Sequence, residues 1–73
     1  MAAAARAEEL LSYFTGLAPV GEPVVVRRVE TMADLQLDHN TYSQCLNHLV
    51  GGKYVRRIST RLLIVLRRPE EFA

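Results

Sequence analysis

Two stretches of the chain place apolar residues at the spacing of an amphipathic helix. In the first stretch, an i, i+1, i+4, i+7 pattern is formed by Leu10, Leu11, Phe14 and Leu17. This pattern predicts a helix over residues 2–15 that ends at Gly16, where a left-handed residue would close the last turn. Residues 17–23 contain two prolines and a glycine, which predicts an irregular connector.

The second stretch has the cleanest helical periodicity in the sequence. Its apolar positions, at i, i+3, i+4, i+7 and i+8, are Tyr42, Cys45, Leu46, Leu49 and Val50. We expect a helix over residues 41–50, because Thr41 and Gln44 match a capping box and Leu37 precedes the cap as a hydrophobic staple. Gly51-Gly52 predicts a sharp end to this helix.

Runs of β-branched and large apolar residues predict three strands. The first is the valine-rich segment 24–29, because valine loses side-chain freedom in a helix and fits a pleated surface. Segments 53–58 and 61–68 predict two further strands. They are joined tightly at Ser59-Thr60, or by a longer loop that includes Arg61.

Residues 30–37 have room for only one or two helical turns. Thr31 followed by Asp34 is a weak capping arrangement, so a short helix over residues 31–35 is expected. The predicted order is helix, strand, helix, helix, strand, strand, which is an α+β fold class. At 73 residues the chain forms a single small domain, in which residues 1–9 are a candidate frayed end.

The composition excludes several classes of protein. Apolar residues make up 49% of the chain and charged residues 23%, as in a folded globular domain. Cys45 is the only cysteine, so an internal disulfide and a Cys₂His₂ or Cys₄ zinc site are excluded. The longest apolar run, residues 62–66, is far shorter than the ~20 residues of a membrane-spanning helix. The acidic Glu8 and Glu9 argue against a leader, so we expect a cytoplasmic or nuclear protein with no membrane partner.

Charge is distributed unevenly along the chain, although the formal net charge is only +1. Residues 1–38 carry three cations and six acids, whereas residues 39–69 carry six cations and no acid. Such a one-sided field is typical of a surface that faces phosphate or an acidic partner. The alternative is that the arginines flank apolar strands and oppose aggregation.

The layout of elements over residues 10–66 resembles a winged helix-turn-helix domain. It is most similar to the C-terminal DNA-binding domain of regulators related to the cyclic-AMP receptor protein. The matching parts are the strand 24–29, the short helix 31–35, the helix 41–50, and a wing hairpin entered through Gly52 and completed by residues 62–66. Ala33 matches the small residue of the first helix, whereas Gln36-Leu37 stands where the turn usually has a glycine.

The resemblance implies transcription regulation through double-stranded DNA, with the helix 41–50 as the recognition helix in the major groove. Its outward face would present His39, Asn40, Ser43, Gln44, Asn47 and His48. All six side chains form hydrogen bonds and none is a carboxylate, and asparagine and glutamine can pair bidentately with adenine. The alternative interpretation is an ordinary polar helix face.

Basic residues of the predicted wing are candidates for contacts with phosphate. They are Lys53, Arg56, Arg57 and Arg61. The alternative is that these cations solvate an exposed sheet face. Of Arg27 and Arg28, only one can point outward, and the other is expected to flank the sheet edge or to pair with Glu30 or Asp34.

The last predicted strand does not alternate between apolar and polar residues over positions 62–66. A three-stranded sheet covered on one face would leave either Leu63 and Val65, or Leu62, Ile64 and Leu66, without cover, which indicates an interface. We expect Leu63, Val65 and Arg67 to contact a protein partner or a second copy of the chain, as in winged helices that serve as protein–protein modules. Cover by the N-terminal helix or by Phe72 is the alternative.

Catalytic chemistry has little support in this sequence. His39 and His48 lack a carboxylate positioned to orient an imidazole, and Cys45 with His48 supplies too few ligands for a structural zinc site. The sequence therefore predicts no enzyme, no metal, no cofactor and no small-molecule substrate. DNA binding is the predicted function, and protein docking through residues 61–68 is the alternative.

Overall fold

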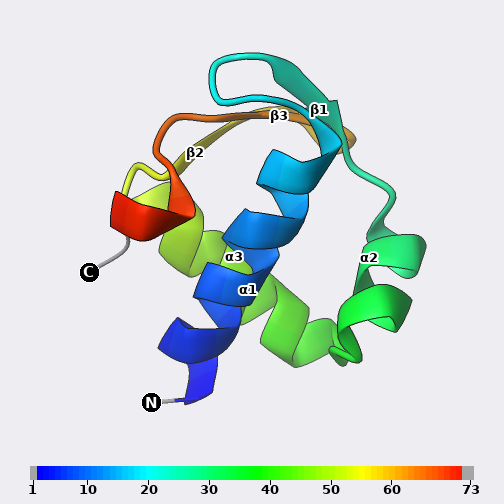
Figure 1. Ribbon diagram of the computed structural model, residues 1–73. Coiled ribbons are helices and arrows are strands. Elements are labelled where there is room, and N and C mark those ends of the chain that lie inside the picture. The colour runs from blue at the N-terminus through cyan, green and yellow to red at the C-terminus, as the bar shows by residue number, and fades with distance from the viewer. Residues whose placement is uncertain (1, 72–73) are drawn as a thin grey trace.

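The computed structural model describes residues 2–71, with side chains from residue 6 onward, and it confirms the predicted α+β order (Figure 1). The helices are α1 (Ala2–Leu17), α2 (Arg28–Leu35) and α3 (His39–Gly51). The strands are β1 (Pro23–Val25), β2 (Val55–Ser59) and β3 (Leu62–Val65). A 3₁₀ turn, η1 (Pro69–Glu71), follows. Phe72, considered above as a cover for the last strand, lies outside the described residues.

The strands form one antiparallel sheet in the order β1-β3-β2, so β3 is central. Val24 of β1 lies opposite Leu63, and Val55 of β2 lies opposite Val65. Side chains of directly opposed residues point to the same face of a sheet. All four are buried, so this inner face of the sheet is the one that the helices cover.

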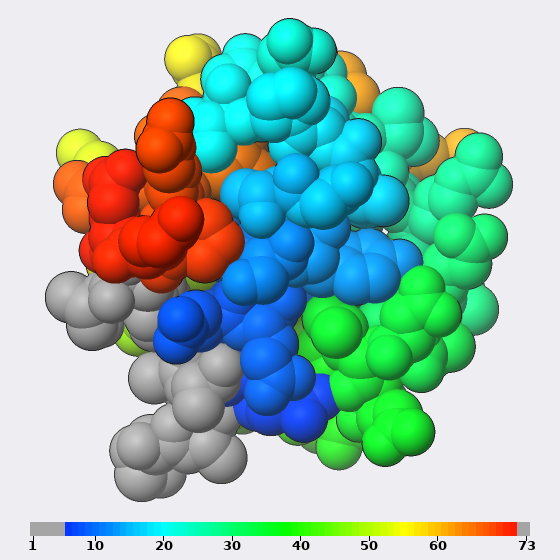
Figure 2. All heavy atoms as spheres, viewed as in Figure 1, coloured from blue at the N-terminus to red at the C-terminus, as the bar shows by residue number. Residues whose placement is uncertain are grey.

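The hydrophobic core joins this inner sheet face to α1 and α3. The buried helix residues include Leu10, Leu11 and Phe14 of α1, together with Tyr42, Cys45, Leu46 and Leu49 of α3. The two predicted apolar stripes are therefore core stripes, apart from Leu17, which is exposed, and Val50, which is partly buried. Figure 2 shows α1 running along the middle of one face, with η1 and α2 on either side.

The first helix begins at Ala2, as predicted, but its C-terminal end differs from the prediction. Gly16 does not stop α1, which continues to Leu17 and ends before Pro19. Proline disfavours the helical conformation of the residue before it, which explains this later end. Residues 2–9 belong to the helix, and Ala7 is fully buried.

The predicted strand 24–29 is wrong beyond Val25. After Val26 donates its N–H to the Arg61 carbonyl at 2.7 Å, the chain turns at Arg27 and enters α2. Val29 therefore lies on a helix, and Thr31 is a buried helix residue rather than a cap. Packing of α2 against the rest of the fold overrides the strand preference of valine, because that preference is only a weak bias.

The second cap also differs from the prediction. Asp38, not Thr41, caps α3, and its carboxylate accepts a hydrogen bond from the Thr41 backbone N–H at 2.7 Å. The helix therefore begins at His39, and Leu37 precedes the observed cap and is buried in the core. Gly52 follows the last helical residue, so the predicted end is confirmed.

The hairpin is shorter than predicted, and its two-residue turn is Thr60-Arg61 rather than Ser59-Thr60. A bulge between Arg57 and Ser59 interrupts the ladder. Residues 66–68 lie outside the sheet, because the Leu66 N–H bonds to the Tyr54 carbonyl before β2 begins.

Candidate functional site

The exposed face of α3 is the first component of the candidate site. Burial of Tyr42, Cys45 and Leu49 turns the opposite face of the helix toward solvent. The exposed positions there are His39, Asn40, Gln44, Asn47 and His48, and Ser43 is partly exposed. Every member of the predicted base-reading set is therefore accessible, and none is an acid.

Arg28 is a second component, which the sequence did not place. Its Nη2 lies 2.7 Å from His39 Nδ1 and 3.3 Å from the Ser43 Oγ. Its guanidinium lies over the Tyr42 ring, 5.2 Å from the ring centroid, at the distance of a cation–π contact. The sequence predicts only that one of Arg27 and Arg28 points outward while the other flanks the sheet edge or pairs with Glu30 or Asp34. Arg28 contacts α3 instead, because α2 begins earlier than predicted.

Arg57 is the third component. It lies opposite Leu63 in the ladder, so it is on the inner sheet face, which is the side of α3. Burial raises the pKa of the Tyr42 hydroxyl, and the positive charges of Arg28 and Arg57 act against that shift. Two arginines from different elements therefore act on one tyrosine of α3.

The remaining predicted cations do not join this cluster. Arg56 lies opposite Ile64 and therefore faces the outer side of the sheet, away from Arg57. Arg61 is in the β2–β3 turn beside Val26. Lys53 is in the turn after α3, with a φ of 63°. Arg56 and Arg57 therefore lie on opposite faces of the sheet, because adjacent strand residues point to opposite faces.

The predicted protein interface at Leu63 and Val65 is also wrong. Both side chains belong to the core, with 2% and 0% of their surface exposed. Leu62 and Ile64 occupy the outer face and are partly exposed. Arg67 lies over the ring of Tyr54, with the guanidinium 5.2 Å from the ring centroid. Register decides which half of an apolar strand is inside, and the sequence of this strand does not show it.

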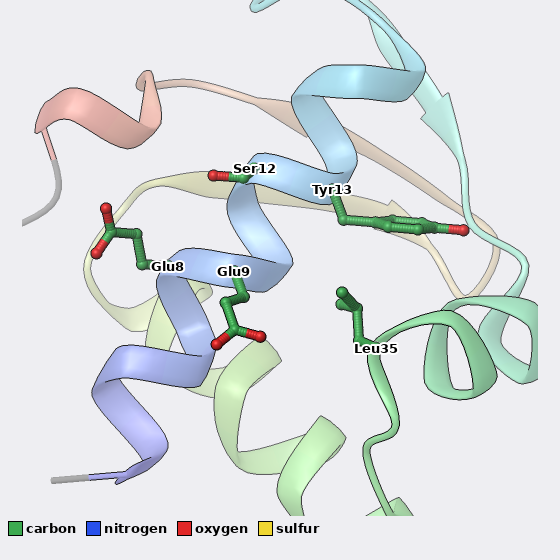
Figure 3. A pocket seen from close by; sticks show the side chains of 5 residues that line it. All are labelled: Glu8, Glu9, Ser12, Tyr13 and Leu35. Carbon is green, nitrogen blue, oxygen red and sulfur yellow. The ribbon is translucent and has the colours of Figure 1, made fainter.

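Acidic residues gather on a different side of the molecule, around a shallow hollow between α1 and the end of α2 (Figure 3). Glu8, Glu9 and Tyr13 line this hollow, together with Ser12 and Leu35. The Tyr13 hydroxyl donates to Asp34 at 2.6 Å, and this hydrogen bond raises the pKa of Tyr13.

Arg6 is a cation of this acidic side of the molecule. It donates to the Leu35 carbonyl and lies 3.5 Å from the Glu9 carboxylate. Across residues 6–71 that pair is the one ion pair between side chains. Arg28 and Arg57 are therefore not neutralised by any described carboxylate.

The described residues contain no cluster of three or more side chains able to hold a metal ion. Cys45 is buried, and burial raises the pKa of its thiol, which disfavours the reactive thiolate. No helix within residues 2–71 combines the length and the apolar character needed to cross a bilayer. No family model, curated protein or solved structure matches the chain.

Proposed function

We propose that this protein binds double-stranded DNA through the exposed face of α3. The observation that carries the proposal is the meeting of this acid-free face with Arg28 and Arg57, which come from α2 and β2. The order of elements is also that of the winged helix-turn-helix domains that the sequence resembles, in which the corresponding helix enters the major groove.

In this proposal, base edges in the major groove are contacted by Asn40, Gln44 and Asn47. These exposed residues follow one another at intervals of four and three positions, about one helical turn each, so they lie along one line of the helix surface. Amide side chains donate and accept at once, which matches the edge of adenine in the major groove.

In this proposal, the DNA phosphates are contacted by Arg28 and Arg57. The Arg28 guanidinium stacks on the Tyr42 ring. Because this contact already restricts the Arg28 side chain, less conformational entropy is lost when the arginine binds phosphate. Glu8 and Glu9 line the hollow beside α1 and repel phosphate there, whereas α3 itself contains no acid, so phosphate is favoured on the exposed face of α3 over this hollow.

The charge arm of the test uses two neighbouring arginines. Fluorescence anisotropy with random duplex DNA at several salt concentrations measures the slope of log K against log salt. Arg57→Gln should reduce that slope by about 0.9, the value for one lost phosphate contact. Arg56→Gln removes the same charge from the outer sheet face and is expected to leave the slope nearly unchanged.

The sequence-reading arm uses Gln44→Ala combined with Asn47→Ala. This double variant should lose discrimination between selected and random duplexes while keeping most of its non-specific affinity, because the phosphate contacts remain. Ser12→Ala on the exposed side of α1 is the matched control. Absence of any complex at low salt, or equal effects of Arg56→Gln and Arg57→Gln, would overturn the proposal.

A further inference from the structure

A second surface lies where β1 leads into α2, and it meets the exposed face of α3 at Arg28, which belongs to both. A groove of about 860 Å³ is lined by residues of this junction and of the β2–β3 turn. Its apolar lining includes Val25, Val29 and Ala33, and its charged lining includes Arg27, Arg28 and Arg61 against the single acid Glu30. We call this surface the junction groove.

The junction groove exposes large apolar side chains to solvent. Val25 is 61% exposed and Val29 is 82% exposed, and both are large aliphatic side chains. A second hollow, which shares Val25 with the junction groove, includes Leu17, which is 53% exposed. Clustered exposed apolar residues mark interaction surfaces more often than isolated ones do.

The charges that line the junction groove indicate which kind of ligand would bind there. Three arginines line the groove, and Arg28 extends toward α3, which leaves Arg27 and Arg61 as the cations that no other described side chain engages. Neither forms an ion pair within residues 6–71. The surface therefore complements a ligand that carries both carboxylates and large apolar side chains.

We propose that the junction groove docks an acidic, apolar segment of a partner protein. Duplex DNA complements the arginines but leaves the exposed valines without apolar contact. A second copy docked by two-fold symmetry would bring Arg27 and Arg61 close to their own counterparts, which is unfavourable. A peptide in which acidic residues alternate with leucine satisfies both features, because leucine covers the valines while carboxylates meet the arginines.

The probe for this proposal is a short labelled peptide in which glutamate alternates with leucine. Amide signals of the full chain are followed by NMR during titration with the peptide, and shifts are expected at residues 25–33 and 60–61. Two matched peptides, with lysine in place of glutamate or serine in place of leucine, should not produce these shifts.

Two substitutions test the residues of the groove. Val29→Ser removes apolar surface from an exposed position and is expected to weaken the peptide complex about tenfold if its methyl groups are covered. Arg61→Gln should weaken it about two- to fivefold. Leu66→Ser and Arg68→Gln make similar changes at exposed positions outside the groove and should leave the affinity unchanged.

Three results would overturn the proposal. They are failure of the glutamate–leucine peptide to bind, peptide shifts confined to α3, and self-association that Val29→Ser abolishes. Val29→Ser should leave the anisotropy titration with DNA unaltered, so loss of the docking site and loss of DNA binding are separate outcomes.

Discussion

Replacement of Leu63 by alanine tests the register of the sheet, on which the placement of Arg57 depends. Leu63 is 2% exposed, so its truncation removes buried methyl groups and leaves a cavity. Such truncations cost about 2–5 kcal/mol. A chain of this length has a free energy of unfolding of about 4–11 kcal/mol, so the variant should lose a large fraction of its stability.

Ile64→Ala is the matched control, because the next residue in β3 points to the outer face and lies opposite Pro23 and Arg56. Its side chain is only partly buried, so we expect a loss of about 1 kcal/mol. Urea unfolding followed by circular dichroism measures both variants. With a slope of about 1 kcal/mol per molar urea, Leu63→Ala should lower the midpoint by about 2 M or more.

Equal losses in the two variants, or a larger loss for Ile64→Ala, would refute this register. If Ile64 were the inner residue and this pairing of β2 with β3 were kept, Arg56 would replace Arg57 beside α3. Sedimentation of Leu63→Ala gives an independent check. If Leu63 were an interface residue, its loss would change the oligomeric state and leave the urea midpoint nearly the same.

Two further predictions concern the turn between α2 and α3. The hydrogen bond from the Thr41 backbone N–H holds the pKa of Asp38 below its usual value, so this carboxylate stabilises the fold above about pH 4 and loses that effect as the pH falls through the lowered pKa. Asp38→Asn keeps an amide oxygen as the cap, so its free energy of unfolding should equal that of the parent at pH 7. Below about pH 4 the variant should lose less of this free energy than the parent, as measured by urea unfolding. The same acid dependence in both proteins would contradict this prediction. Gln36 has a φ of 55° and a ψ of 46°, which is a left-handed conformation that suits glycine. Gln36→Gly should therefore raise the free energy of unfolding by about 0.5–1 kcal/mol. An unchanged urea midpoint would show that Gln36 is not strained.

Local sequence patterns were sufficient for the existence of α1 and α3 and for the outward face of α3. The stripe from Tyr42 to Leu49 identifies the buried side of that helix, which places Asn40, Gln44 and Asn47 outside. This inference succeeds because helical periodicity depends on residues only a few positions apart. The end of α3 at Gly51-Gly52 was predictable for the same reason.

Competing local signals misled the prediction at two boundaries. Asp38 and Thr41 are both good caps, and only the folded chain shows that Asp38 receives the hydrogen bond. Residues 24–29 are rich in valine, yet the strand ends at Val25 and the chain enters α2 at Arg28, where Thr31 becomes a buried helix residue. Valine is compatible with that helix, since its lower helix propensity costs less free energy than tertiary packing contributes.

By itself, the sequence determined the α+β class, the order of the elements and the acid-free polar face of α3. The tertiary structure alone decided that Leu63 and Val65 are core residues, that Arg28 reaches across to Tyr42, and that Arg56 and Arg57 serve opposite faces. The physical reason is the range of the interactions. A helical stripe repeats within a single segment, whereas strand register and the meeting of side chains from α2, α3 and β2 exist only once distant segments pack together.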